Sequence, residues 1–282
     1  MQRGFNGRTG KAEQLSMPIF ESHCHLDDDA FRNDLGAVLQ RARTSDIQAL
    51  MVVGTDAASS QRAVEIADRY PHVLAAIGLH PHDASSWTED ILEHLQALAG
   101  HPKVRAWGEI GLDFNRMRSP RPAQEFAFMR QLEIARGLGL SMIFHERDSQ
   151  GRFLQILRSQ WDSHCQGVVH CFSGNEAELE AYLELGLHIG ITGILTHKER
   201  GASLRRMVPR IPDQRLLLET DAPYLTPSPE RNKFRRNEPA FLRTVLLKLA
   251  QVRRQEPAEL AAAMWSNTCT LFGVPGNFGT DA

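Results

Sequence analysis

Eight short apolar runs are spaced along the chain, and a stretch of helical character follows most of them. The runs are rich in Val, Ile, Leu and Ala, and they lack the polar–apolar alternation of a strand with one solvent-exposed face. Strands buried on both faces of a parallel sheet have this composition. The pattern predicts parallel strands at residues 19–24, 47–53, 73–79, 104–110, 140–144, 167–171, 187–191 and 215–219.

The stretches between the runs predict a barrel rather than an open sheet. Eight strands separated by helices favour a closed (β/α)8 TIM barrel, an α/β fold. No linker or internal repeat interrupts the alternation, so residues 17–276 are predicted to be a single TIM-barrel domain. Residues 224–237 are expected to form a long basic loop after the last strand. Helices are expected at 34–43, 59–69, 90–99, 123–137, 176–185, 238–255 and 257–271.

The two ends fall outside this pattern. Residues 1–16 are polar and Gly-rich without the apolar core of a secretory signal, so we expect a disordered extension or tag, or a true start at Met17. Residues 277–282 are assigned to a tail.

Composition narrows the function classes. A net charge of −2 gives no global basic field, so nucleic-acid binding would need a local patch. The four cysteines form no CxxC pair, which indicates reduced thiols and a cytoplasmic location. No apolar run approaches the roughly 20 residues that a membrane span requires, so no membrane partner is expected.

Histidines and carboxylates recur at the ends of the apolar runs. His23 and His25 lie two residues apart, so on a strand both side chains share one face. In a TIM barrel the carboxyl ends of all strands meet at one mouth, where active sites form. Six ligands are enough for two divalent ions sharing one carboxylate, a centre suited to in-line phosphoryl displacement. The expected ligands are His23, His25, Glu109, His145, His170 and Asp221.

Six short motifs resemble those of one family. They are HCHLD at 23–27, GLHPH at 78–82, GEIGLD at 108–113, HCFSG at 170–174, ETDAPY at 219–224 and RNEP at 236–239. In this order they resemble the TatD family of metal-dependent deoxyribonucleases, within the amidohydrolase-like barrels. Two positions depart from the family's usual pattern: Glu21 stands where Asp is common, and Glu146 follows His145 where a small residue is usual.

The resemblance implies roles for these residues. His23, His25 and Asp221 would hold one metal, His145 and His170 the other, and Glu109 would bridge them. Glu109 and Asp221 are therefore the expected catalytic residues, with Asp221 also managing the proton of the attacking water. The alternative for Asp221 is a helix N-cap ahead of Pro223. The implied cofactors are two divalent ions, Mg or Mn, with Zn as the other possibility, and the implied activity is 3′→5′ digestion of single-stranded DNA ends.

Four further residues are expected to contact substrate. His80 belongs to the GLHPH motif and could reach the substrate or a water. Arg147, Arg235 and Arg236 are expected to contact phosphate, because a guanidinium fork matches phosphate oxygens. The alternative for the loop arginines is a solvated charged loop.

Two other functions stay open at this point. The same metal centre polarises carbonyls, so hydrolysis of an amide, ester or lactone is the alternative enzyme activity. Arginines at the mouth favour phosphate over that alternative. A barrel that only binds is the non-enzymatic alternative, and the complete ligand set argues against it. No obligate protein partner is evident, and the residues do not fix the native metal, the preference for DNA over RNA, or the oligomeric state.

Overall fold

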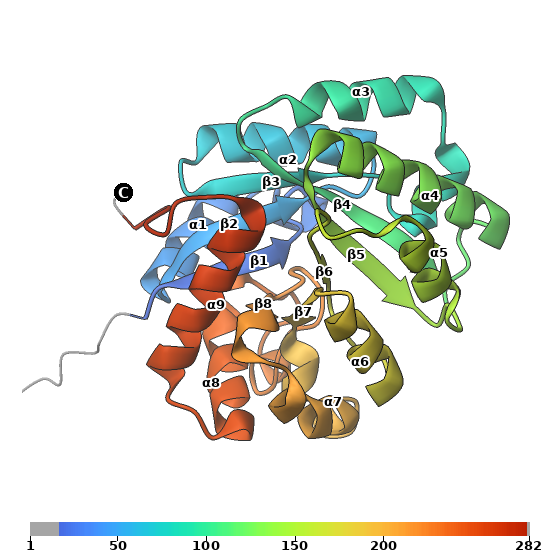
Figure 1. Ribbon diagram of the computed structural model, residues 1–282. Coiled ribbons are helices and arrows are strands. Elements are labelled where there is room, and N and C mark those ends of the chain that lie inside the picture. The colour runs from blue at the N-terminus through green and yellow to red at the C-terminus, as the bar shows by residue number, and fades with distance from the viewer. Residues whose placement is uncertain (1–16, 281–282) are drawn as a thin grey trace, which may run out of the picture.

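Eight parallel strands follow one another around a barrel in the computed structural model, which describes residues 17–280 (Figure 1). Each strand pairs in parallel with the next along the chain. The strands are β1 (Ile19–Cys24), β2 (Ile47–Val53), β3 (Val73–Ile77), β4 (Val104–Asp113), β5 (Ser141–Arg147), β6 (Gly167–Val169), β7 (His188–Ile191) and β8 (Leu216–Leu218).

Helices surround the strands, as Figure 1 shows. They are α1 (Leu35–Thr44), α2 (Ala57–Arg69), α3 (Glu89–Ala99), α4 (Arg121–Leu138), α5 (Arg152–Gln160), α6 (Glu176–Glu184), α7 (Ala202–Met207), α8 (Leu242–Arg253) and α9 (Pro257–Phe272). The helices α5 and α7 were not among those predicted. Between Asp221 and α8 there is only short 3-10 structure, and none of it begins at Asp221, so the helix N-cap interpretation of Asp221 is wrong.

Hydrogen bonds join the first and last strands, or the residues that directly follow them, and so close the barrel. The Ser22 hydroxyl donates to the Leu218 carbonyl at 3.0 Å, and the Asp221 amide donates to the His23 carbonyl at 3.0 Å. The His25 amide donates to the Ala222 carbonyl at 2.7 Å. The predicted (β/α)8 fold is confirmed, and its closure ties the segment that carries His23 and His25 to the segment that carries Asp221.

The strands differ from prediction mainly at the mouth of the barrel. β4 and β5 each run three residues further than predicted, with Leu112 opposite Glu146 and Asp113 opposite Arg147. The prediction ended β4 at Ile110 and β5 at Phe144. The ladder continues for three more residues in each strand and ends at two polar residues at the mouth, Asp113 and Arg147.

The opposite end of the barrel is closed by α9. Trp265 and Phe272 of α9 form one buried cluster with strand residues that include Phe20 and Met51. The end of the described chain covers the same region, because Phe278 stacks on Phe20 with ring centroids 6.1 Å apart. Residues 277–280 of the expected tail therefore lie against the barrel. The expected extension at 1–16 and the last two tail residues lie outside the described residues.

No helix in the described range 17–280 is both long enough and apolar enough to cross a membrane.

Acid should destabilise the fold through His188. Burial, with the charge of Arg215, lowers the pKa of His188 from 6.5 to about 4. The folded state thus disfavours the protonated imidazole. As the pH falls from about 6.5 towards 4, the free energy of unfolding should therefore fall by about 3 kcal/mol in all. His188→Gln should remove this loss, which urea unfolding in EDTA at pH 7 and pH 4 would measure. The exposed His94→Gln is the control, and equal pH dependence in both variants would contradict the assignment.

Candidate metal centre

Two histidines from the end of β1 direct their rings into the mouth. His23 lies in β1 and His25 directly follows it, and both side chains are buried. Their Nε2 atoms are 3.2 Å apart. His25 Nδ1 lies 2.8 Å from the Val53 carbonyl, which can only accept, so Nδ1 carries the proton. His25 Nε2, the ring nitrogen left over for a metal, therefore points towards His23 and the carboxylates beyond it.

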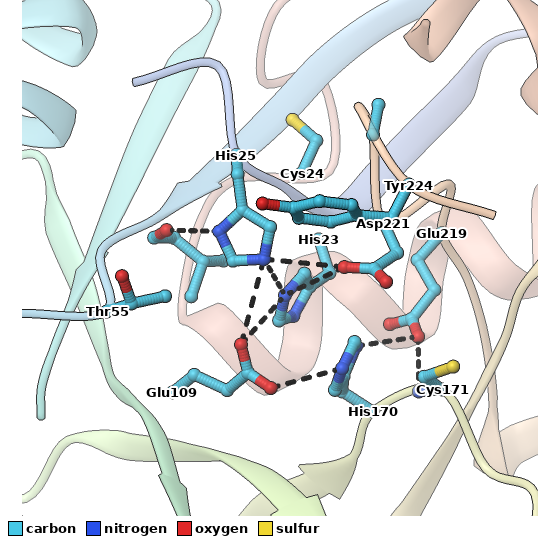
Figure 2. Close-up of polar contacts among 12 residues, drawn as sticks. His23, Cys24, His25, Thr55, Glu109, His170, Cys171, Glu219, Asp221 and Tyr224 are labelled. Carbon is cyan, nitrogen blue, oxygen red and sulfur yellow. Dashed lines mark hydrogen bonds and ion pairs between the residues drawn. The ribbon is translucent and has the colours of Figure 1, made fainter. Parts of the chain in front are cut away.

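Glu109 of β4 stands between two groups of histidines, as Figure 2 shows in part. Its Oε2 lies 3.5 Å from His23 Nε2 and 3.7 Å from His25 Nε2. Its Oε1 lies 2.6 Å from His145 Nδ1 and 3.2 Å from His170 Nε2. Each group thus faces a different oxygen of one buried carboxylate, which is the arrangement that a bridging ligand needs.

Asp221 completes the first of these groups. Its Oδ1 lies 3.3 Å from His25 Nε2 and 3.9 Å from His23 Nε2. The backbone of Asp221 is left-handed, with φ of 58°, a conformation that aspartate adopts more readily than most residues. This turn after β8 aims the carboxylate back at β1 rather than out to solvent.

The structure brings all six predicted ligands together. Ligand atoms of His23, His25 and Asp221 lie within 4.8 Å of one another, as do those of His23, Glu109 and His170. A third such group joins His80 to Glu109 and His145. Cys171 forms a fourth group with His170 and Asp221, and sequence reasoning did not single it out as a ligand.

Buried carboxylates behind the ligands hold them in place. Glu219 Oε1 accepts from His170 Nδ1 at 3.1 Å, which leaves His170 Nε2 free to face Glu109. Glu21, the departure noted in the first motif, accepts from the Thr220 amide at 2.9 Å and the His23 amide at 3.1 Å. It therefore ties the end of β8 to β1. Burial raises the pKa of Glu21 to about 8.

Asp113 and His82 were missed as site residues. Asp113, at the end of β4, is buried and its Oδ2 lies 2.8 Å from His82 Nε2 and 3.3 Å from His145 Nε2. The signal was present in the GEIGLD and GLHPH motifs. It went unused for Asp113 because the predicted strand ended at residue 110, and for His82 because only His80 of its motif was taken as a substrate contact.

The donor set fits divalent cations. The Nδ1 protons of His25 and His170 are used by Val53 and Glu219, so their Nε2 atoms face carboxylate oxygens. Imidazole nitrogens that face carboxylates favour positive charge between them, supplied either by a proton or by a bound cation. Imidazole and carboxylate together suit Mn or Zn, while carboxylates also suit Mg.

The electrostatics agree with this fit. Burial alone would raise the pKa of Glu109, but the nearby imidazoles of His170 and His80 hold it well below its usual value. Burial also opposes the charge on Asp221, and the bond from His25 lowers its pKa. Although burial disfavours its charge, His25 has a pKa raised to about 9 by Asp221 and then Glu109. The centre therefore holds two ionised carboxylates and stabilises positive charge.

The four residues that were expected to contact substrate lie in different parts of the structure. His80 lies beside the centre, with Nε2 3.6 Å from Glu109 Oε1, and burial lowers its pKa to about 4. Arg147 is the last residue of β5, at the mouth, and is partly exposed. Arg235 lines a neighbouring cleft. Arg236 is instead held by protein carboxylates.

Arg236 forms part of an ion-pair network behind the loop. Its guanidinium donates to both oxygens of Asp34 at 2.8 Å and to Glu238 at 2.7 Å. It also lies over the Phe31 ring, 4.7 Å from the centroid. These partners occupy the guanidinium N–H groups that a phosphate would need. The role of Arg236 in substrate binding stays a prediction.

If Arg236 has a structural role, its loss should affect stability rather than substrate binding. Arg236→Met should lower the free energy of unfolding by about 1–3 kcal/mol, because two carboxylates lose charged hydrogen bonds. The KM for single-stranded oligonucleotides should change little. Urea unfolding and steady-state kinetics on the same preparation would test this, and a raised KM at unchanged stability would restore the phosphate contact.

A TIM barrel that gathers histidines and carboxylates at the carboxyl ends of its strands, around a shared glutamate, is a metal-dependent hydrolase. The family model described as TatD related DNase matches residues 20–273, so the chain belongs to this family. The family, the fold and the enzyme class expected from the motifs are thus confirmed.

Named relatives cover nearly the whole chain. The protein named 3′-5′ ssDNA/RNA exonuclease TatD of Citrobacter rodentium is 43% identical over 259 residues, which is 91% of this chain and 98% of that protein. The protein of the same name from Klebsiella pneumoniae is 41% identical over 261 residues, 92% and 99% of the two chains.

Solved structures agree. A TatD homologue of Escherichia coli K12 superposes with a TM-score of 0.85 at 33% identity, covering 93% of this chain and 100% of that one. A TatD family hydrolase of Entamoeba histolytica gives 0.83 at 26% identity, covering 91% and 98%.

Proposed function

We propose that this chain is a two-metal exonuclease that removes nucleotides from the 3′ ends of single-stranded DNA, with Mg or Mn as the native ions. The observation that carries the proposal is the division of ligands between the two oxygens of Glu109. The names of the relatives support the substrate and the polarity, and they extend the proposal to RNA.

The site residues have distinct tasks in this proposal. His23, His25 and Asp221 would hold one ion, His145 and His170 the other, and Glu109 both. When bound, the ions would activate water and stabilise the charge that develops on the phosphoryl oxygens.

The remaining steps belong to the protein. Asp221 is ionised at neutral pH and takes the proton of the attacking water on a carboxylate oxygen. His80 is neutral and lies close enough to the centre to donate a hydrogen bond to the terminal phosphate. Arg147 offers a guanidinium at the same mouth.

A labelled-end experiment tests the proposal. Chelator-treated protein is incubated with a 5′-labelled and a 3′-labelled single-stranded oligonucleotide, each with Mg, Mn or Zn added back. We expect a descending ladder from the 5′ label and immediate release of mononucleotide from the 3′ label, in Mg or Mn. Absence of cleavage with every ion, together with turnover of p-nitrophenyl acetate, would replace the proposal by the carbonyl-hydrolase alternative.

The cytoplasmic location also stays a proposal. The four cysteines are unpaired in the structure, two of them buried, as expected for a reducing compartment.

A further inference from the structure

A cleft of about 680 Å³ lies beside the metal centre on the same face of the barrel. One wall is the segment after β7, with His197 and Arg200, and the other is the long loop after β8, with Thr226, Arg231 and Arg235. Both segments follow the carboxyl ends of strands, as the metal ligands do.

The cleft is basic in a chain whose net charge is −2. Four cations line it, Lys198, Arg200, Arg231 and Arg235, against the single carboxylate of Glu199. All four are exposed, and no hydrogen bond or ion pair of their side chains is found within residues 17–280.

This lack of partners is unusual for the arginines of the region. Arg210 pairs with Glu176 at 2.9 Å, and Arg205 donates to the Leu195 carbonyl at 2.8 Å. The carboxylate of Glu230, although it belongs to the same loop, accepts from the Thr244 hydroxyl and is not among the residues that line the cleft. Unneutralised cations in a concave site focus a positive potential and attract an anionic ligand.

An exposed aromatic ring stands among these charges. Phe234 lines the cleft, is 49% exposed and contacts Phe241 at a centroid distance of 5.2 Å. A phenyl ring between exposed arginines offers a base a stacking surface, which an acidic protein segment does not need.

The cleft continues from the metal centre. Leu225 lines it and is four residues from Asp221, so the backbone separates the two by at most about 14 Å. Between them, the Tyr224 ring lies 6.0 Å from the His25 ring. The His197 ring bonds the Thr226 carbonyl at 3.0 Å and the Ser228 amide donates to Thr196 at 2.8 Å, which fixes the two walls together.

We propose that this cleft binds the part of a single-stranded nucleic acid that lies 5′ of the cleaved end, through phosphate contacts to Arg200, Arg231 and Arg235 and stacking on Phe234. The inference rests on the proposed exonuclease function and adds a second, extended subsite to it. The subsite should make affinity grow with strand length, because a dinucleotide held at the metal centre cannot reach the far side of the cleft.

Binding measured without turnover tests the subsite separately from the chemistry. Fluorescein-labelled dT2, dT6 and dT12 are titrated with the EDTA-treated full chain, and anisotropy gives Kd at several salt concentrations. In Arg231→Gln/Arg235→Gln we expect dT12 to bind at least tenfold more weakly and dT2 to be unchanged. The log–log salt slope should fall by about 1.4, since each single-strand phosphate contact contributes about 0.7. Phe234→Ala should weaken dT12 binding with an unchanged slope.

Matched controls use similar residues elsewhere. Arg69→Gln/Arg254→Gln removes two exposed cations from the C-terminal ends of α2 and α8, which lie at the opposite end of the barrel. Phe126→Ala removes a ring that is 47% exposed and contacts Trp87 at 5.6 Å. Both controls should bind dT12 as the unsubstituted chain does.

The outcomes separate the two proposals. Equal dT12 affinity in the cleft variants and the controls would overturn the subsite, whether or not the chain digests DNA. Length-dependent binding that the cleft variants lose, without cleavage under any ion, would keep the subsite and remove the exonuclease function. If polyglutamate bound as tightly as dT12 and Phe234→Ala had no effect, the cleft would be a surface for an acidic protein, and the nucleic-acid assignment would be wrong.

Discussion

Glu109→Gln is expected to lower kcat on a single-stranded oligonucleotide by at least about 10³-fold, the scale of losing a preorganised electrostatic group. Glu109 is the only carboxylate among the described residues whose two oxygens face both histidine groups. The amide keeps the shape but loses the charge that joins the groups. The bound metal, measured by mass spectrometry of the digested protein, should fall from two ions per chain to one or none.

Glu146→Gln is the matched control for this substitution. Glu146 also lies near the mouth, directly after His145, but its Oε1 accepts from the Ser149 amide at 3.0 Å and the Ser149 hydroxyl at 2.6 Å. We expect its variant to keep two ions and a kcat within a few-fold of the unsubstituted chain. A Glu109→Gln variant with two ions and ordinary turnover would show that Glu109 is not the bridge.

The barrel could be predicted because parallel strands buried on both faces leave a clear signal. β1 and β2 have the predicted bounds, and every residue of the two strands except Gln48 is buried. β4 could not be bounded in this way. Its last residue, Asp113, is polar by sequence and buried in fact, because it lines the site.

The ligands could be predicted because each lies near the end of an apolar run, and a TIM barrel brings the carboxyl ends of its strands together. Contacts between elements that are distant in sequence could not be predicted. Arg236 was expected to face phosphate, but its guanidinium pairs with Asp34, 202 residues away. Nothing local to the loop carries that information. Glu21 looked like a departure, and only the closure of β8 on β1 explains it.

Asp221→Asn is expected to lower kcat at least about 100-fold, the lower scale for losing a general base. The asparagine oxygen can still approach His23 and His25, so part of the metal affinity should remain. An amide cannot take the proton of the attacking water, however, so single-turnover cleavage should stay slow even when Mn saturates the site. The pH–rate profile should also lose the limb that reports the base.

Asp28→Asn serves as the control for that measurement. Asp28 lies at the same mouth, where its carboxylate accepts from the Tyr224 hydroxyl at 3.2 Å and from the Ala30 amide at 2.7 Å, and asparagine caps equally well. Its kcat should stay within a few-fold of the unsubstituted chain. If Asp221→Asn turned over normally once loaded with Mn, Asp221 would be a ligand alone. The proton would then have to leave through another group at the mouth, and the Asp113–His82 pair, 2.8 Å apart beside His145, is the one the geometry offers.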